Sequence, residues 1–312
     1  MRTGAADHQR ILQQASAWRG ADMALATVIN TWSSAPCPLG THMLIHADGR
    51  FIGSVSGGCV EGDVLIRAAE VMATGIHQIE RYGISDGAAW EVGLPCGGDI
   101  EILIQCVNQS SFSPDLFDKI GKARADGRSV IVETDLLTGV SMIEPGNLPS
   151  PFRNLYAPAK RLFIIGAVEI AAALAGIARQ LDIAPTIIDP RARFLTPERF
   201  PDVALDDRWP DEAIAALSLD DRSAIVTLSH DPKIDDLALI AGLKTSATYI
   251  AALGSKKSHA ARLERLRAAG ISVEALSRIE GPAGVTINSI SASEIGLSIA
   301  GGMVRAFNHG HR

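Results

Sequence analysis

The sequence predicts an α/β protein in which an N-terminal α+β domain precedes a C-terminal Rossmann-like domain with a doubly wound parallel sheet. Three observations support this. After about residue 160, apolar strand-like segments alternate with amphipathic helix-like segments, an order typical of parallel sheets. Before that point strands and helices are mixed and define no topology. Between the two regions, residues 144–151 contain three prolines, which indicates a linker.

The proline-rich segment divides the chain into three parts. We predict an N-terminal domain over residues 1–143, a linker over 144–159 and a Rossmann-like domain over 160–312. A chain of 312 residues is long enough for two domains that each bury a core. Hydrophobic residues make up 47% and charged residues 21% of the chain, so most of it is expected to fold.

In the N-terminal domain, short apolar segments predict strands and helical periodicity predicts two helices. Strands are expected at residues 24–29, 43–46, 51–55, 100–107 and 129–133. Helices are expected at residues 61–73 and 116–125. The first of these helices places Val64, Ala68, Val71 and Met72 on one side, which indicates that this side is buried.

In the C-terminal domain the elements alternate. Strands are expected at residues 161–165, 184–188, 224–228 and 248–252. Helices are expected after the first strand and at residues 234–243 and 256–269. The apolar face of the first helix is expected to consist of Ile170, Ala173, Leu174, Ile177 and Leu181. A last helix is expected to begin near Ser291, which has capping-box spacing with Glu294, and to bury Ile295, Ile299, Met303 and Phe307.

The composition argues against several classes of protein. The formal net charge is -6 and the basic residues are scattered, so nucleic-acid binding is not expected. None of the four cysteines forms a C-x-x-C pair, so no structural zinc site is expected. The first twenty residues lack a signal peptide's apolar core, and the longest apolar stretch, 162–178, is interrupted by Glu169. We expect a cytoplasmic protein without a membrane span.

The first strand of the C-terminal domain opens into a glycine turn and a helix, as in dinucleotide-binding folds. The turn begins with Gly166, but Val168 stands where G-x-G-x-x-G requires a second glycine for close approach to a pyrophosphate. Glu169 adds a negative charge at the helix N-terminus. Asp189 stands where such folds place the acid that binds ribose. A nucleotide site and a Rossmann scaffold without a tight NAD site both remain open.

Two further loops follow strands at the same expected edge of the sheet, where such folds bind ligands. Gly254, Ser255, Lys256 and Lys257 precede a helix, and their N–H groups and two lysines suit an anion such as phosphate. A plain turn with solvated lysines is the alternative. His230 and Asp231 follow another strand, as ligand-binding residues or as a polar loop in which Asp231 caps the next helix.

Two cysteines lie in glycine-rich motifs. Cys59 follows Gly57 and Gly58 and precedes Val60 and Glu61, and Cys96 is followed by Gly97, Gly98 and Asp99. Paired glycines let a ligand approach the backbone, and a thiolate near a helix N-terminus is a soft ligand for metals and sulfur chemistry. A small buried core residue is the alternative for each cysteine. Cys106 alternates within a strand and is expected to pack, whereas Cys37 lies in a loop without an assigned role.

Together these motifs resemble the xanthine dehydrogenase accessory factor family, XdhC/CoxI. The order and spacing of the blocks carry the resemblance, which runs from about residue 20 to residue 305. The blocks are Ser34-Ala35-Pro36, Pro38-Leu39-Gly40, Gly53, Gly57-Gly58-Cys59-Val60-Glu61, Cys96-Gly97-Gly98, His230-Asp231, Gly254-Ser255-Lys256-Lys257, Gly281-Pro282-Ala283-Gly284, Ser293-Glu294-Ile295 and Ser298-Ile299.

The resemblance implies an accessory protein that is not itself a catalyst. Members of the family bind the molybdenum cofactor, as molybdopterin or its dinucleotide form, protect it during sulfuration by a cysteine desulfurase, and help insert it into a molybdenum hydroxylase. It makes Cys59 and Cys96 candidates for contact with the molybdenum, and it makes their motif neighbours candidates for binding the cofactor, namely Gly57, Gly58, Glu61, Gly97 and Gly98. It also implies that the Rossmann edge, with Gly166, Asp189 and the two later loops, holds the phosphate or nucleotide end of the cofactor.

Other functions are compatible with parts of the sequence. An NAD(P)-dependent oxidoreductase would use the Rossmann order and Asp189, but Val168 and the lack of a Tyr-x-x-x-Lys pair argue against it. A sulfur carrier would bear a persulfide on Cys59 or Cys96. A nucleotide sensor would need neither cysteine. A homodimer is expected, because proteins of this kind often form ligand sites across interfaces.

Overall fold

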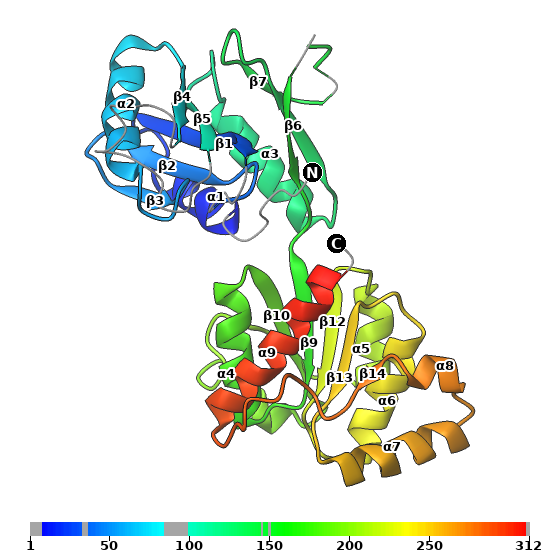
Figure 1. Ribbon diagram of the computed structural model, residues 1–312. Coiled ribbons are helices and arrows are strands. Elements are labelled where there is room, and N and C mark those ends of the chain that lie inside the picture. Colours follow the sequence, from blue (N-terminus) through cyan, green and yellow to red (C-terminus); the bar gives the residue numbers. More distant parts are fainter. Residues whose placement is uncertain (1–7, 33–36, 84–98, 145, 149–150, 310–312) are drawn as a thin grey trace. The chain divides into compact units, whose positions relative to one another are not determined.

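The computed structural model describes residues 8–32, 37–83, 99–144, 146–148 and 151–309. The chain divides into two compact units, one ending at Pro158 and the other beginning at Ala159 (Figure 1). This division falls inside the segment 144–159 that the sequence pattern predicts to be a linker.

The first unit contains a five-stranded antiparallel sheet with strand order β3-β2-β1-β5-β4. Its strands are β1 (Met23–Trp32), β2 (His42–His46), β3 (Phe51–Gly53), β4 (Gln78–Tyr82) and β5 (Asp99–Cys106). Its helices are α1 (His8–Ala17), α2 (Glu61–Thr74) and α3 (Pro114–Ala125).

The central strand β1 explains how this sheet is covered. Its first seven residues are all buried, because helices pack on both faces of the sheet. On one face Ala24, Ala26 and Val28 contact the apolar side of α2. On the other face Leu25 lies in the apolar cluster to which α1 and α3 contribute. The apolar side predicted for α2 is confirmed for Val64, Ala68 and Val71, which are fully buried, whereas Met72 is partly buried.

A three-stranded antiparallel sheet, in the order β7-β6-β8, completes the first unit. It comprises β6 (Val130–Thr134), β7 (Ser141–Ile143) and β8 (Phe152–Tyr156). The linker prediction is therefore wrong for residues 152–156. Phe152, Asn154 and Tyr156 alternate as buried residues, and this strand pairing outweighs the nearby prolines as a structural signal.

The second unit confirms the predicted Rossmann-like architecture. Its sheet is parallel and six-stranded, in the order β11-β10-β9-β12-β13-β14. The strands are β9 (Lys160–Ile165), β10 (Ile183–Ile188), β11 (Ala204–Asp206), β12 (Ser223–Thr227), β13 (Tyr249–Ala252) and β14 (Ile279–Glu280). The helices are α4 (Glu169–Gln180), α5 (Pro210–Leu217), α6 (Pro232–Leu243), α7 (Lys256–Ala268), α8 (Val273–Leu276) and α9 (Ala292–His309), with a 3₁₀ turn at Ala192–Phe194.

Helices cover both faces of the parallel sheet (Figure 1). One apolar cluster joins the sheet to α4 and α9, and the other joins it to α5, α6, α7 and α8. The strand order reverses direction between β9 and β12, and ligands of open parallel sheets bind at the carboxyl ends of the strands at such a point. No helix in the described ranges is long and apolar enough to cross a membrane.

Candidate functional site

The loop from Ser54 to Glu61 is organised around one carboxylate. Glu61 is 8% exposed, and its oxygens accept hydrogen bonds from the hydroxyls of Ser54 and Ser56. They also accept from the backbone N–H groups of Val55, Ser56, Gly58 and Val60. Burial favours the neutral acid, but these hydrogen bonds outweigh it and lower the pKa of Glu61 to about 2. The ionised carboxylate, a predicted cofactor contact, is thus committed to shaping the loop.

Cys59 stands at the end of this loop. Gly57 and Gly58 have φ of +80° and +113°, which a residue with a side chain rarely adopts, and the Cys59 N–H donates to Ser56 Oγ at 2.9 Å. Because α2 begins at Glu61, Cys59 lies two residues before the helix rather than in its first turn. Its half-buried side chain packs against the apolar cluster beneath α2, and within the described ranges its thiol makes no hydrogen bond.

The other cysteines divide into two groups. Cys37 packs against the same apolar cluster as Cys59, and its thiol donates to the Ser54 carbonyl at 3.8 Å. It therefore lies beside the Cys59 loop, a proximity that the sequence did not reveal. Cys106 is buried, donates to the Val71 carbonyl and has a raised pKa because of burial, which confirms the packing prediction. Cys96, Gly97 and Gly98 lie outside the described residues.

The described residues offer no ready-made metal centre. Among them, no three His, Cys, Asp or Glu side chains gather closely enough to hold an ion. Residues 84–98 are not among them, so a molybdenum contact at Cys59 and Cys96 stays a prediction.

At the carboxyl edge of the second sheet, the loops after β9 and β12 touch. Gly166 has φ +108°, and a Cβ atom on it would lie 2.8 Å from the backbone nitrogen of Ser229. A glycine is required here because its neighbour is backbone and cannot move aside as a flexible side chain would. This contact lies where the strand order reverses, at the edge that the sequence pattern predicts to bind ligands.

Gly166→Ala is expected to destabilise the second unit by about 1–3 kcal/mol, from the left-handed φ and the close Ser229 backbone. Denaturant unfolding measures this loss. Gly176→Ala is the control, because a Cβ there meets nothing within 4 Å and alanine favours a helix. A Gly166→Ala protein as stable as the control would contradict the close contact.

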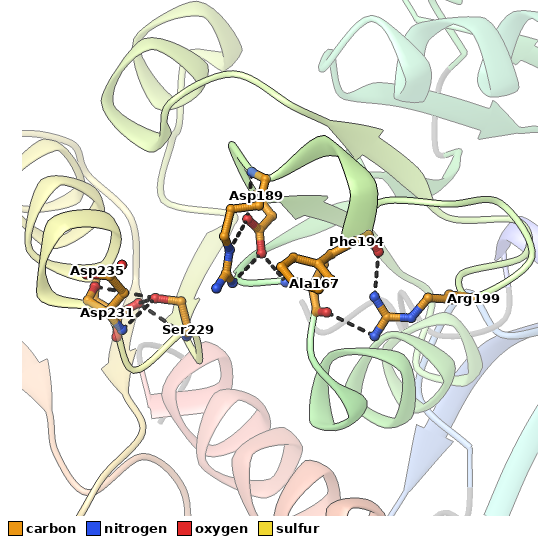
Figure 2. Close-up of polar contacts among 8 residues, drawn as sticks. Ala167, Asp189, Phe194, Arg199, Ser229, Asp231 and Asp235 are labelled. Carbon is orange, nitrogen blue, oxygen red and sulfur yellow. Dashed lines mark hydrogen bonds and ion pairs between the residues drawn. The ribbon is translucent and has the colours of Figure 1, made fainter.

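Asp189 is fully buried at the end of β10 (Figure 2). Its carboxylate accepts the Ala167 N–H at 2.8 Å, the Arg191 N–H at 2.9 Å and the Arg191 guanidinium at 2.9 and 2.8 Å. Burial raises the pKa of Asp189, but these hydrogen bonds outweigh it and leave the pKa below its usual range. Because both oxygens are engaged, a ribose diol would have to displace Arg191 to reach them.

Arginine side chains lie beside the Gly166 turn, near the position where a ribose diol would bind in a dinucleotide-binding fold. The Arg191 and Arg193 guanidinium carbons lie 4.9 and 5.0 Å from the centre of the Phe194 ring. Arg199 donates to the carbonyls of Phe194 and Ala167 (Figure 2). None of these arginines belongs to a recognised sequence motif, although two of them, Arg191 and Arg193, follow Asp189 at short spacing. Because Arg191 is paired with Asp189, the positive charge that these arginines add to the edge comes from Arg193 and Arg199, and Glu169 opposes it.

The His230-Asp231 loop is confirmed as a helix cap. Asp231 accepts the Lys233 N–H at 3.0 Å, while His230 has a left-handed φ of +61° and an exposed side chain. Ser229 donates its hydroxyl to Asp235 at 2.6 Å (Figure 2). Asp235 is 3% exposed, and burial raises its pKa despite this hydrogen bond. The His230 side chain is thus open to solvent beside a buried carboxyl group.

The Gly254 loop begins α7 in the predicted way. Ser255 caps the helix by accepting the Ser258 N–H at 3.1 Å, and Lys256 and Lys257 are exposed in the first turn. Gly254 has φ +142°. The edge thus presents the amino ends of α4, α6 and α7 together with several cations, an arrangement that suits an anionic group.

Comparison with known proteins gives one family match in each unit of the chain. Residues 17–83 match the model of the XdhC and CoxI family, and residues 162–303 match the XdhC Rossmann domain. The molybdenum cofactor insertion chaperone PaoD of Escherichia coli is 28% identical over 304 residues, which span 94% of this chain and 86% of that protein.

A Bacillus subtilis protein, named as a probable subunit of xanthine dehydrogenase, is 23% identical over 90% of this chain and 92% of that protein. A crystal structure described as a xanthine dehydrogenase from Bacillus halodurans superposes with a TM-score of 0.82 at 22% identity, covering 98% of this chain and 96% of that chain. The likeness to the crystal structure shows that the fold is shared.

Proposed function

The chain belongs to the XdhC and CoxI family, and on that premise we propose that it is a maturation factor that binds the molybdenum cofactor. In this proposal it supports sulfuration of the cofactor and its insertion into a molybdenum hydroxylase such as xanthine dehydrogenase. The similarity to a molybdenum cofactor insertion chaperone extends over both units of the chain, which supports a shared role.

The observation that carries the proposal is the preformed loop at Cys59. Six hydrogen bonds to Glu61 fix the loop, so the thiol is held in place before any ligand arrives. Small residues around it leave the backbone open, since a Cβ on Gly57 or Gly58 would meet nothing within 4 Å. A soft thiol on an open loop suits the sulfur-ligated molybdenum end of the cofactor.

The Rossmann edge supports binding of the other end of the cofactor. Arg191 and Arg193 lie in the turn that follows β10, and Lys256 lies in the first turn of α7, where the helix amino end favours negative charge. We propose that this edge holds the phosphate or the nucleotide of the cofactor, with Gly166, Asp189, His230, Asp231, Gly254 and Ser255 shaping it.

Binding of NAD(P) is the weaker alternative. Val168 has an extended backbone at the position of the second fingerprint glycine, and the Asp189 carboxylate is occupied by Arg191. Both features oppose the usual contacts of the pyrophosphate and of the ribose diol. We further propose a cytoplasmic homodimer that meets a cysteine desulfurase and a molybdenum hydroxylase.

Cofactor retention tests the proposed function. The protein would be purified anaerobically from cells that make molybdenum cofactor, and bound molybdenum and oxidised pterin measured by mass spectrometry and fluorescence. Near-stoichiometric pterin is expected for the wild-type protein. Cys59→Ala is expected to retain at least about tenfold less, because a thiolate–metal contact is worth more than about 1.4 kcal/mol.

Cys106→Ala is the matched control, because this buried cysteine packs against α2 away from solvent and is expected to leave retention unchanged. Cys96→Ala extends the test to the second motif. Absence of pterin from folded wild-type protein would count against the whole proposal. Equal retention in Cys59→Ala and the wild type would remove Cys59 from the site.

A further inference from the structure

Arg262 is a buried cation, and only some of its N–H donors have a hydrogen-bond acceptor. It lies on α7 and is 5% exposed. One terminal nitrogen donates to the Leu253 carbonyl at 2.8 Å. Its Nε and its other terminal nitrogen are buried and find no hydrogen-bond partner among the residues that the structure describes. Unpartnered buried guanidinium N–H groups are unfavourable, so their presence indicates a group that binds there.

The guanidinium reaches the amino end of its own helix. Helical side chains lean toward the N-terminus, and Arg262 extends to Leu253, two residues before the cap Ser255. A Cβ on Gly254 would lie 3.8 Å from the same guanidinium and 2.6 Å from the Ser258 hydroxyl, so glycine keeps this space clear. First-turn N–H groups of a helix have no intrahelical acceptor and face the same end.

The nearest acids are engaged by other groups. Asp235 and Asp236 on α6 both attract Arg262. Yet the Asp235 carboxylate accepts the Ser229 hydroxyl at 2.6 Å, and Asp236 forms an ion pair with Arg265 at 2.7 Å. In the described part of the chain, neither acid lies close enough to Arg262 to form an ion pair with it. The guanidinium therefore keeps donors for a further anion.

We propose that Arg262 forms the floor of a phosphate site at the amino end of α7. Its charged N–H donors and the helix N-terminus together match a phosphate monoester, and Lys256 and Lys257 lie on the exposed first turn. The proposal rests on the proposed function, since a phosphate monoester is the terminal group of molybdopterin, the form of the cofactor without an attached nucleotide. It deepens that function by naming the residue that recognises this group.

Phosphate titration of the full chain tests the site. Isothermal titration calorimetry with inorganic phosphate at low salt is expected to show saturable binding by the wild-type protein. Arg262→Gln should weaken it at least tenfold, because the buried charged donors are lost. Arg267→Gln is the matched control, since it removes the same charge from the same helix at an exposed position whose ion-pair partner is Glu264, and it should change binding less than twofold.

A second variant distinguishes loss of phosphate binding from a folding defect. Arg262→Lys keeps the charge but loses the forked donors, and it is expected to bind phosphate with intermediate affinity while thermal unfolding stays close to wild type. Wild-type protein that shows no saturable phosphate binding overturns the inference, as does equal weakening by Arg262→Gln and Arg267→Gln. Pterin retention without phosphate binding would refute the Arg262 site alone, whereas phosphate binding without pterin retention would refute the proposed function alone.

Discussion

Glu61→Ala is expected to destabilise the first unit by about 3–5 kcal/mol, because it leaves buried N–H and hydroxyl donors without their acceptor. This corresponds to a fall in the melting temperature of about 10 °C for a unit of this size. The loop that holds Cys59 should open at the same time. Hydrogen exchange of peptides from β1 reports the first unit separately from the second.

Glu70→Ala is the matched control on the same helix. Glu70 is exposed and pairs with Arg67 at the surface, so its loss is expected to cost less than about 1 kcal/mol. Glu61→Gln keeps the shape of the side chain but lacks the charge, and it should fall between the two. Equal exchange rates in Glu61→Ala and Glu70→Ala would show that the carboxylate does not organise the loop.

The pKa of Glu61 also predicts a pH effect. The pKa is about 2 in the folded protein and near 4.5 in the unfolded chain. A depressed carboxyl pKa stabilises the folded state above the unfolded pKa. This stabilisation is therefore expected to disappear as the pH falls from about 4.5 toward 2.

Acidification from pH 7 to 4.5 is expected to lower the free energy of unfolding of the first unit by about 2–3 kcal/mol through His8 alone. Burial, and then the nearby Arg124 cation, lower the pKa of His8 from 6.5 to about 4. Between pH 6.5 and about 4, His8 is protonated in the unfolded chain but stays neutral in the folded chain. The stabilisation is therefore present above 6.5 and lost as the pH falls toward 4.

His42 adds to this acid sensitivity. Its Nε2 atom lies 2.7 Å from the Tyr156 hydroxyl and 3.1 Å from the Asn154 amide nitrogen, and Nδ1 lies 2.9 Å from the Thr27 hydroxyl. The amide N–H donor requires an acceptor at Nε2, so this network fits the neutral ring with its proton on Nδ1. Burial, reinforced by the neighbouring His8, lowers the pKa of His42 well below its usual value.

Denaturant unfolding at several pH values, followed by hydrogen exchange in β1, measures the acid effect. His8→Gln is expected to remove about 2 kcal/mol of the loss between pH 7 and 4.5, because one titrating group is gone. His230→Gln is the control, since this histidine is exposed and lies in the other unit. An unchanged acid slope in His8→Gln would refute the buried-histidine explanation.

The sequence by itself determined the alternating elements of the second unit. Apolar strands, and apolar helix faces such as those that contain Leu174 and Ile299, are recognised by local periodicity. That periodicity can be read without knowing what the element packs against. The glycine loops at Gly57 and Gly254 could also be located from the sequence, because glycines in such short motifs usually mark turns with a positive φ. Short elements such as β8 and β14 could not, since pairing with neighbouring strands, not local sequence, makes them strands.

Only the tertiary structure decided which charged side chains are available to a ligand and which form hydrogen bonds within the fold. Glu61 and Asp189 looked like ligand contacts, but their carboxylates are occupied by the loop around Ser56 and by Arg191. Arg262 drew no notice as one of several charged residues in its helix, and the structure buries it against the Leu253 carbonyl. The physical reason is that the sequence gives a charge and its approximate position, whereas its desolvation and its partners depend on segments distant in the chain.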